Sequence, residues 1–175
     1  MQKISGFIDS LNEKVGLFVS WLTTVLVLVV CYDVFTRYVL RKSSIAVQEL
    51  EWHLFAVIFL VGAAYTLKYD RHVRVDVLYV NFSPKTKAWI NFLGSLLFLI
   101  PFAVLVLWTS KTFVANSFLI QETSPDPGGL PGRFIIKACI PLGFILLLLQ
   151  GISLAIKSGL TTLTHNAVQK ESGDD

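Results

Sequence analysis

The stretch of sequence that decides the fold is VLVLVV at residues 25–30, which lies at the centre of a longer apolar segment, residues 15–37. Three further segments share this character, and they span about residues 45–67, 89–115 and 134–156. Each is close to the roughly 20 residues that a helix needs to cross about 30 Å of hydrocarbon. Backbone N–H and C=O groups inside a bilayer must be paired within their own segment, so these segments are predicted to be helices. The sequence therefore predicts an all-α integral membrane protein with four transmembrane helices.

The composition of the chain agrees with this class of protein. Hydrophobic residues make up 54% and charged residues 15% of the 175 residues, against about 45–50% and 25% in soluble domains. These values exclude a disordered chain and a disulfide-stapled secreted module. The net charge of +3 is too small, and the basic residues too dispersed, for a nucleic-acid-binding protein. We expect one transmembrane domain over residues 1–160 and a polar, flexible tail over residues 161–175.

The first fourteen residues are predicted to form a short N-terminal interfacial amphipathic helix, separate from the first span. Ile4, Phe7, Ile8, Leu11 and Val15 recur at helical spacing, while polar residues occupy the other positions. A helix of this kind lies in the plane of the lipid headgroups before the chain turns into the membrane. An unstructured tail is the alternative interpretation.

The distribution of Lys and Arg predicts the orientation. With four spans, the N-terminal tail, the second loop and the C-terminal tail share one side and hold nine Lys and Arg residues, against six on the other side. Cytoplasmic segments carry an excess of these residues. Both termini are therefore predicted to be cytoplasmic, and the first and third loops lie on the outer side.

The sequence shows no motif that brings catalytic or ligand-binding side chains together. Of the three His residues only His53 lies near a span, so a haem held by two His ligands is not expected. The chain contains no G-x-S-x-G, H-E-x-x-H, Walker or G-x-G-x-x-G motif. Cys31 and Cys139 are interpreted as buried small residues, with a disulfide as the alternative. The sequence thus predicts neither an enzyme nor a cofactor or metal site.

Charged residues near the outer ends of the first two spans are the candidate functional residues. Asp33 and Arg37 are four residues apart and can pair on one helix face; Glu49 and His53 repeat the spacing, with Glu51 between them. Charges at membrane depth are costly and often functional. The simplest interpretation is a cluster that ties the first two spans together. Contact with a partner protein and a proton or ion path are the alternatives.

Small residues at a spacing of four predict close contacts between helices, because they let backbones approach within the membrane. Pro101 and Pro141 each remove a helix hydrogen bond and are expected to bend the third and fourth spans. The positions that we expect in helix contacts are Gly16, Ser20, Gly62, Gly143, Gly151 and Ala155.

An ordered set of motifs runs through the chain: RY at residues 37–38, QE at 48–49, GAAY at 62–65 and HVRVD at 72–76. With these motifs, residues 20–155 resemble the small membrane subunit of tripartite ATP-independent periplasmic (TRAP) transporters, the DctQ-like family. In that family the acidic pair is often adjacent, whereas Glu49 and Glu51 are separated by one residue here.

The resemblance implies a scaffold subunit of a secondary active transporter in the bacterial inner membrane. In such systems a periplasmic binding protein delivers an organic anion to two membrane subunits, and a sodium gradient drives uptake. The large subunit carries the transport sites, so the small subunit would bind it stably and would support docking of the binding protein. Lys68, His72, Arg74 and Asp76 would then hold the cytoplasmic loop near phospholipid headgroups or the large subunit; a solvated charged turn is the alternative.

Two other classes of protein stay open from the residues alone. A stand-alone four-span transporter needs a deeply buried acid near the membrane centre, whereas Asp33 lies near one end of its span. A membrane anchor of a redox enzyme needs haem ligands, which the placement of the His residues disfavours. Transport by the isolated chain would indicate the first class, and a haem absorbance spectrum the second.

Overall fold

The computed structural model describes residues 2–69 and 81–171, with side chains as far as residue 162. Over these residues the secondary structure is helical, and four helices are long and apolar enough to cross a membrane. The prediction of an all-α protein with four transmembrane helices is confirmed.

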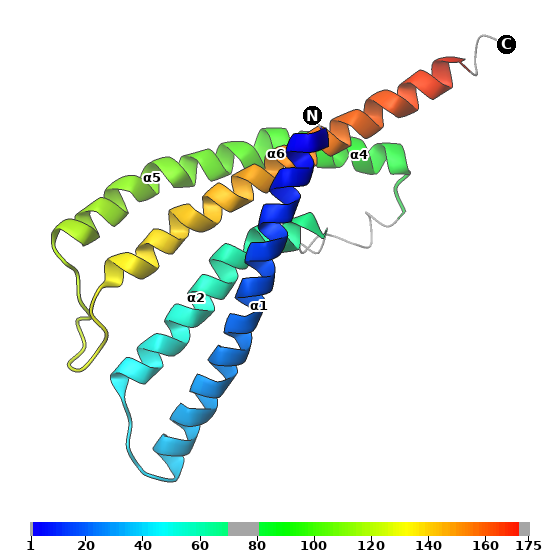
Figure 1. The fold of residues 1–175 in the computed structure, drawn as a ribbon. Helices are drawn as coiled ribbons and strands as arrows, with labels where there is room; N and C mark the ends of the chain where they lie inside the picture. Colours follow the sequence, from blue (N-terminus) through cyan, green and yellow to red (C-terminus); the bar gives the residue numbers. More distant parts are fainter. Residues whose placement is uncertain (1, 70–80, 172–175) are drawn as a thin grey trace.

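The first two spans are single helices joined by a short loop (Figure 1). α1 runs Gln2–Tyr38 and α2 runs Ile45–Lys68. Both end one residue beyond the predicted spans, and α2 begins at the predicted residue. In the loop between them Arg41 adopts a left-handed backbone conformation, with φ of 52°, a region that non-glycine residues enter mainly in turns.

The third span is a helical run of three segments, α4 (Pro84–Gly94), η1 (Ser95–Leu99) and α5 (Ile100–Leu119). η1 is a π-helical turn, in which the hydrogen bonds reach one residue further along the chain than in an α-helix. Pro101 lies two residues after η1, and it has no N–H to donate to the carbonyl group one turn earlier, which lies within η1. The π turn therefore lies where this proline interrupts the α-helical hydrogen bonds.

The fourth span, α6 (Arg133–Glu171), is the longest helix, with 39 residues. It continues through Pro141 as a single helix and extends into the segment predicted to be a flexible tail. At about 1.5 Å per residue, α6 is roughly 58 Å long, about twice the thickness of the hydrocarbon core.

α1 corrects the prediction of a separate interfacial helix at the N-terminus. Residues 2–14 are helical as expected, but they form the first turns of the same 37-residue helix, without a turn before residue 15. The physical reason is the burial of polar side chains on this segment: Ser5 is 2% exposed and Asn12 is 1% exposed. These residues face α6, so α1 continues along that helix.

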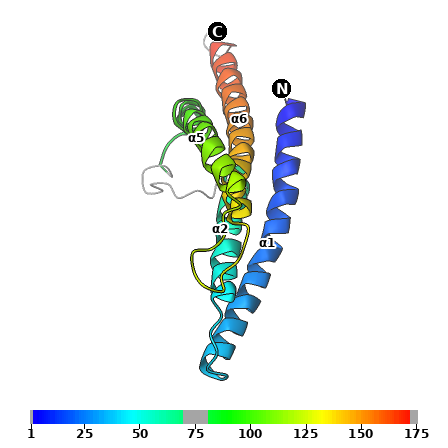
Figure 2. The same ribbon diagram turned by 90° about the vertical axis from the view of Figure 1, so that its left-hand side faces the viewer.

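The helices form a broad layer that is narrow when seen from its edge (Figures 1 and 2). α6 contacts α1, α2, α4, η1 and α5, and α1 and α5 lie on opposite sides of it in the edge-on view. The chain exposes 11737 Å² of surface, whereas a compact soluble protein of this mass, 19.5 kDa, exposes roughly 8,500 Å². The arrangement therefore leaves most apolar side chains outside any core of its own.

The buried core is small and lies where α1, α2 and α6 meet. It consists of Val19, Val61, Ala64 and Leu146. Beside it Gly143 of α6 packs against the backbone of α2, and a Cβ atom at residue 143 would come within 2.5 Å of the Leu60 carbonyl oxygen. Helix contact in this region depends on the close approach of two backbones, as is common between membrane helices.

Candidate functional site

A carboxylate near the start of α2 holds the loop that leads into α6. Glu49 is 4% exposed. Its carboxylate accepts hydrogen bonds from the Ser124 hydroxyl at 2.5 Å, the Leu130 N–H at 2.6 Å and the Arg133 guanidinium at 3.4 Å. A buried carboxylate is costly unless such donors surround it. We call this group of four residues the loop clamp.

Glycine is required where the loop passes the loop clamp. A Cβ atom at Gly129 would collide with the Ser124 side chain and would lie 2.8 Å from a Glu49 carboxylate oxygen. Gly128 has φ of 85°, a conformation that favours glycine. The GG pair thus allows the backbone to reach the carboxylate.

A second ion pair ties the same loop to α6. The Lys137 ammonium donates a hydrogen bond to the Glu122 carboxylate and lies 4.2 Å from the centre of the Phe113 ring. The Arg133 N–H donates to the Glu122 carbonyl oxygen at 2.9 Å. The hydrogen bond from Lys137 holds the pKa of the Glu122 carboxyl below its ordinary value of 4.5. The loop is therefore held at both of its ends.

The structure places the predicted outer residues in separate contacts. Asp33 is 2% exposed, and its carboxylate forms an ion pair with Arg37 on the same helix. His53 uses Nδ1 in a 2.5 Å hydrogen bond with the Glu49 carbonyl oxygen. One carboxylate oxygen of Glu51 is buried without a hydrogen-bond partner among the described residues. The Glu49 side chain bonds to the third loop and α6, so this carboxylate ties the second span to the fourth.

Lys68, at the end of α2, contacts α1. Its ammonium forms an ion pair with Glu13, and the Tyr69 hydroxyl donates to the same carboxylate at 2.8 Å. That hydrogen bond raises the pKa of Tyr69 above its usual value. The predicted residues His72, Arg74 and Asp76 lie outside the described residues.

A buried polar network joins the N-terminal half of α1 to α6, and we call it the α1–α6 seam. The Asn12 amide donates to the Gln150 side-chain oxygen at 2.7 Å, and the Gln150 amide donates to the Asp9 carboxylate at 3.1 Å. Ser153 donates to the same carboxylate at 2.9 Å. The members of the seam are Ser5, Asp9, Asn12, Gln150, Ser153 and Lys157.

None of the six residues of the α1–α6 seam is among the candidate residues predicted from the sequence. The helical pattern of the first fourteen positions predicts polar residues on the water-facing side of a surface helix, but Ser5, Asp9 and Asn12 face α6. Two apolar residues of that segment are the more exposed ones, with Phe7 72% exposed and Ile4 61% exposed, whereas Ile8 is buried at 5%. The available signal is a pair of matching polar stripes: residues 5, 9 and 12 on α1, and residues 150, 153 and 157 inside an apolar span.

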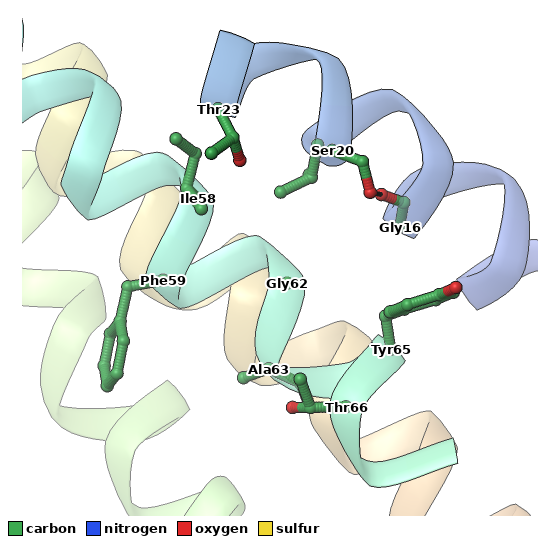
Figure 3. Close-up of a pocket in the computed structure, with 10 residues that line it drawn as sticks. Gly16, Ser20, Thr23, Ile58, Phe59, Gly62, Ala63, Tyr65 and Thr66 are labelled. Carbon is green, nitrogen blue, oxygen red and sulfur yellow. Dashed lines mark hydrogen bonds between the residues drawn. The ribbon is translucent and has the colours of Figure 1, made fainter. Parts of the chain in front are cut away.

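The glycine positions of the first two spans flank a groove between α1 and α2 (Figure 3). The groove has a volume of about 570 Å³ and is lined by four residues of α1, from Gly16 to Thr23, and six residues of α2, from Ile58 to Thr66. Tyr65 reaches toward Gly16 and closes one end, while Phe59 points away from α1. A Cβ atom at Gly62 would meet Val19 only at an ordinary contact distance of 3.5 Å.

The other small residues predicted for helix contacts lie in different surroundings. Gly151 of α6 packs against Leu99, whose side chain a Cβ atom at residue 151 would overlap. Ser20 donates a hydrogen bond to the Gly16 carbonyl oxygen of its own helix, at 2.9 Å. Ala155 is partly exposed. Gly16, Gly143 and Gly151 are thus the predicted positions at which a larger side chain would meet another helix.

The possible metal ligands of the described residues are scattered, and the two cysteines, Cys31 and Cys139, are not paired with each other. The described part of the chain contains no group of three or more His, Cys, Asp or Glu side chains that could hold a metal ion. Cys31 and Cys139 are both free, and Cys31 is exposed on α1, contrary to the expectation that it is buried. The physical reason is that no neighbouring helix of the described chain covers this position of α1.

Four apolar helices that expose most of their surface, held in register by polar contacts, define a multi-pass membrane protein. Residues 26–160 match the family described as tripartite ATP-independent periplasmic transporters, DctQ component. The chain belongs to this family and is therefore the small membrane component of a TRAP transporter. No curated protein matches the chain. The resemblance seen in the motifs is confirmed.

Proposed function

We propose that this chain is a scaffold subunit that supports a large TRAP membrane subunit in the inner membrane during sodium-driven import of organic anions. The observation that carries this proposal is the exposure of its apolar surface. In the most apolar part of each span, between 11% and 33% of the residues are buried inside the chain. Such a surface needs lipid or a second membrane protein as its neighbour.

The large subunit is the partner that we propose for a stable heterodimer, and a periplasmic binding protein is the transient partner. The loop clamp supports the second part, because it holds the third loop in one conformation at the end of the molecule away from the termini. If both termini are cytoplasmic, that loop faces the periplasm, where a binding protein would dock.

Reconstitution tests the proposed role. The chain, the large membrane subunit and the binding protein encoded with it are placed in proteoliposomes with an inward sodium gradient. The labelled probes are succinate, gluconate, taurine and pyruvate, which represent a dicarboxylate, a sugar acid, a sulphonate and a keto acid. We expect uptake of one probe class only when all three proteins and sodium are present.

Two outcomes would contradict the proposal. The first is uptake by this chain alone, which would make it a stand-alone transporter. The second is full uptake by the large subunit and binding protein without this chain. Co-purification with the large subunit provides a separate readout for the partnership. Arg74→Glu tests whether the cytoplasmic loop takes part, and we expect loss of co-purification if it contacts the large subunit.

A further inference from the structure

We propose that the groove between α1 and α2 binds one acyl chain of a phospholipid, from the leaflet on the side of the α1 N-terminus. The groove opens on the surface of two apolar spans. Residues 16–23 of α1 cover about 10 Å along the helix axis, roughly a third of the hydrocarbon thickness. This length matches part of one chain in one leaflet, whereas a partner helix would follow the span through both leaflets.

The chemistry of the groove walls favours hydrocarbon. The Ser20 hydroxyl donates to the Gly16 carbonyl oxygen at 2.9 Å, and the Thr66 hydroxyl donates to the Ala63 carbonyl oxygen at 2.8 Å. These hydroxyl groups already have acceptors within their own helices, so a polar ligand would gain little from them. The apolar members of the walls, such as Ile58 and Phe59, provide the remaining contact surface.

The ammonium of Lys68, which lies beyond one end of the groove in an ion pair with Glu13, favours a phospholipid as the ligand. Tyr65 and Gly16 close the groove at that end, and Lys68 follows one turn later on α2. The ammonium has three N–H donors, and Glu13 accepts one of them. In the proposed complex the phosphate of a lipid whose chain lies in the groove accepts a hydrogen bond from the same ammonium, beside Glu13. Basic side chains at this depth attract anionic headgroups.

Photocrosslinking tests the assignment on the purified full-length chain. The probe is phosphatidylglycerol with a diazirine in one acyl chain, mixed into vesicles of phosphatidylethanolamine and phosphatidylglycerol, and mass spectrometry locates the adducts. We expect adducts concentrated on the ten residues that line the groove, and fewer on exposed neighbours outside it such as Phe18 and Trp21. Gly62→Leu fills the groove and should lower these adducts by about tenfold, the effect of displacing roughly two methylene groups.

Matched variants separate the groove from general contact with lipid. Gly94→Leu makes the same change at a glycine where an added Cβ atom would have no neighbour within 4 Å, and it should leave the groove adducts unchanged. Ala63→Leu fills the groove from a second position, so a folding defect in one variant does not decide the test. Lys68→Gln should remove a preference for the phosphatidylglycerol probe over a phosphatidylethanolamine probe with the same diazirine, while Glu13→Gln, which breaks the same ion pair but keeps the ammonium, should retain it.

Three results would overturn the assignment. Adducts spread evenly over all lipid-facing residues would show no site. Groove adducts that persist in both Gly62→Leu and Ala63→Leu would place the lipid elsewhere. Adducts that disappear when the large membrane subunit is bound would identify a protein as the occupant. Since the assay needs no transport, its failure is distinguishable from a failure of the proposed transport role.

Discussion

α2 packs against a helix on each of its flanks, and the two contacts differ in how closely the backbones approach. Toward α6, a Cβ atom at Gly143 would come within 2.5 Å of the Leu60 carbonyl oxygen. Toward α1, a Cβ atom at Gly62 would lie 3.5 Å from Val19, and a groove opens beside it. The same residue type thus marks a close backbone contact on one flank and an open groove on the other.

The difference shows what fixes helix positions in this protein. Lipid chains are as apolar as Leu, so apolar contact alone gives a helix little preference for one neighbour. Close backbone approach sets the α2–α6 contact, with the loop clamp at its end. Between α1 and α2 a groove remains open, and the α1–α6 seam supplies polar contacts that fix the register of α1.

The largest expected effect separates the two flanks of α2. Gly143→Ala places a methyl group against backbone that cannot move aside, so it should lower the free energy of unfolding by about 1–3 kcal/mol. Gly62→Ala should change it by less than about 0.5 kcal/mol, because the methyl group enters ordinary contact. Unfolding of the purified variants by SDS in mixed micelles measures both. Equal losses would remove the distinction between the flanks.

The next effect concerns the loop clamp. In Glu49→Gln one carboxylate oxygen becomes an amide nitrogen, and this nitrogen then faces the donor group of either Ser124 or Leu130. The neutral side chain also no longer neutralises Arg133. We expect residues 120–132 to be cut several-fold faster by a soluble protease. Glu13→Gln makes the same change on α1, in the ion pair with Lys68 at the opposite end of α2, and should leave this rate unaltered; comparable acceleration by both would show that the clamp does not hold the loop.

A smaller effect is expected in the α1–α6 seam. Gln150→Leu leaves the Asn12 amide without its acceptor and should cost about 0.6 kcal/mol, and at most about 1.7 kcal/mol, the range found for hydrogen bonds between membrane helices. Adding Asn12→Leu should recover part of the loss, because both partners are then apolar. A double-mutant cycle measures the coupling, and strict additivity would argue against it.

The smallest effect is a pH dependence in the third loop. The hydrogen bond from Lys137 lowers the pKa of Glu122 below 4.5. This ion pair therefore contributes its full stabilisation above pH 4.5. It is lost as the pH falls through the lower pKa of the folded state. The melting temperature of the wild type should fall as the pH is lowered through this acidic range. Glu122→Gln should make this fall less steep. An unchanged slope would assign the titration to other carboxylates.

Features that depend on residues close together in the sequence can be predicted from the sequence alone. The four spans follow from continuous apolar runs, and a spacing of four brings Asp33 and Arg37 together on one helix face. The family follows from short ordered motifs. These features need no knowledge of how one helix lies against another.

Features that depend on contacts between segments far apart in the sequence cannot be predicted in the same way. The partners of Glu49 lie 75 to 84 residues further along the chain, and Asn12 is 138 residues from Gln150. The polar stripe on residues 5–12 has the same period whether it faces water or another helix. Only the polar stripe inside the fourth span distinguishes the two cases, because polar side chains at that depth need a partner.

The π turn within the third span preserves the rotational phase of that helix. A π turn holds one residue more than an α turn, and buried side chains lie on both sides of it: Ala88 at 7% exposure and Ala103 at 0%. The extra residue is taken up within that turn, so deleting a single residue from Ser95–Leu99 would convert it into an α turn and leave α4 and α5 on nearly their present faces. The third span can therefore lose one residue at this place without turning Ala88 away from its present neighbours.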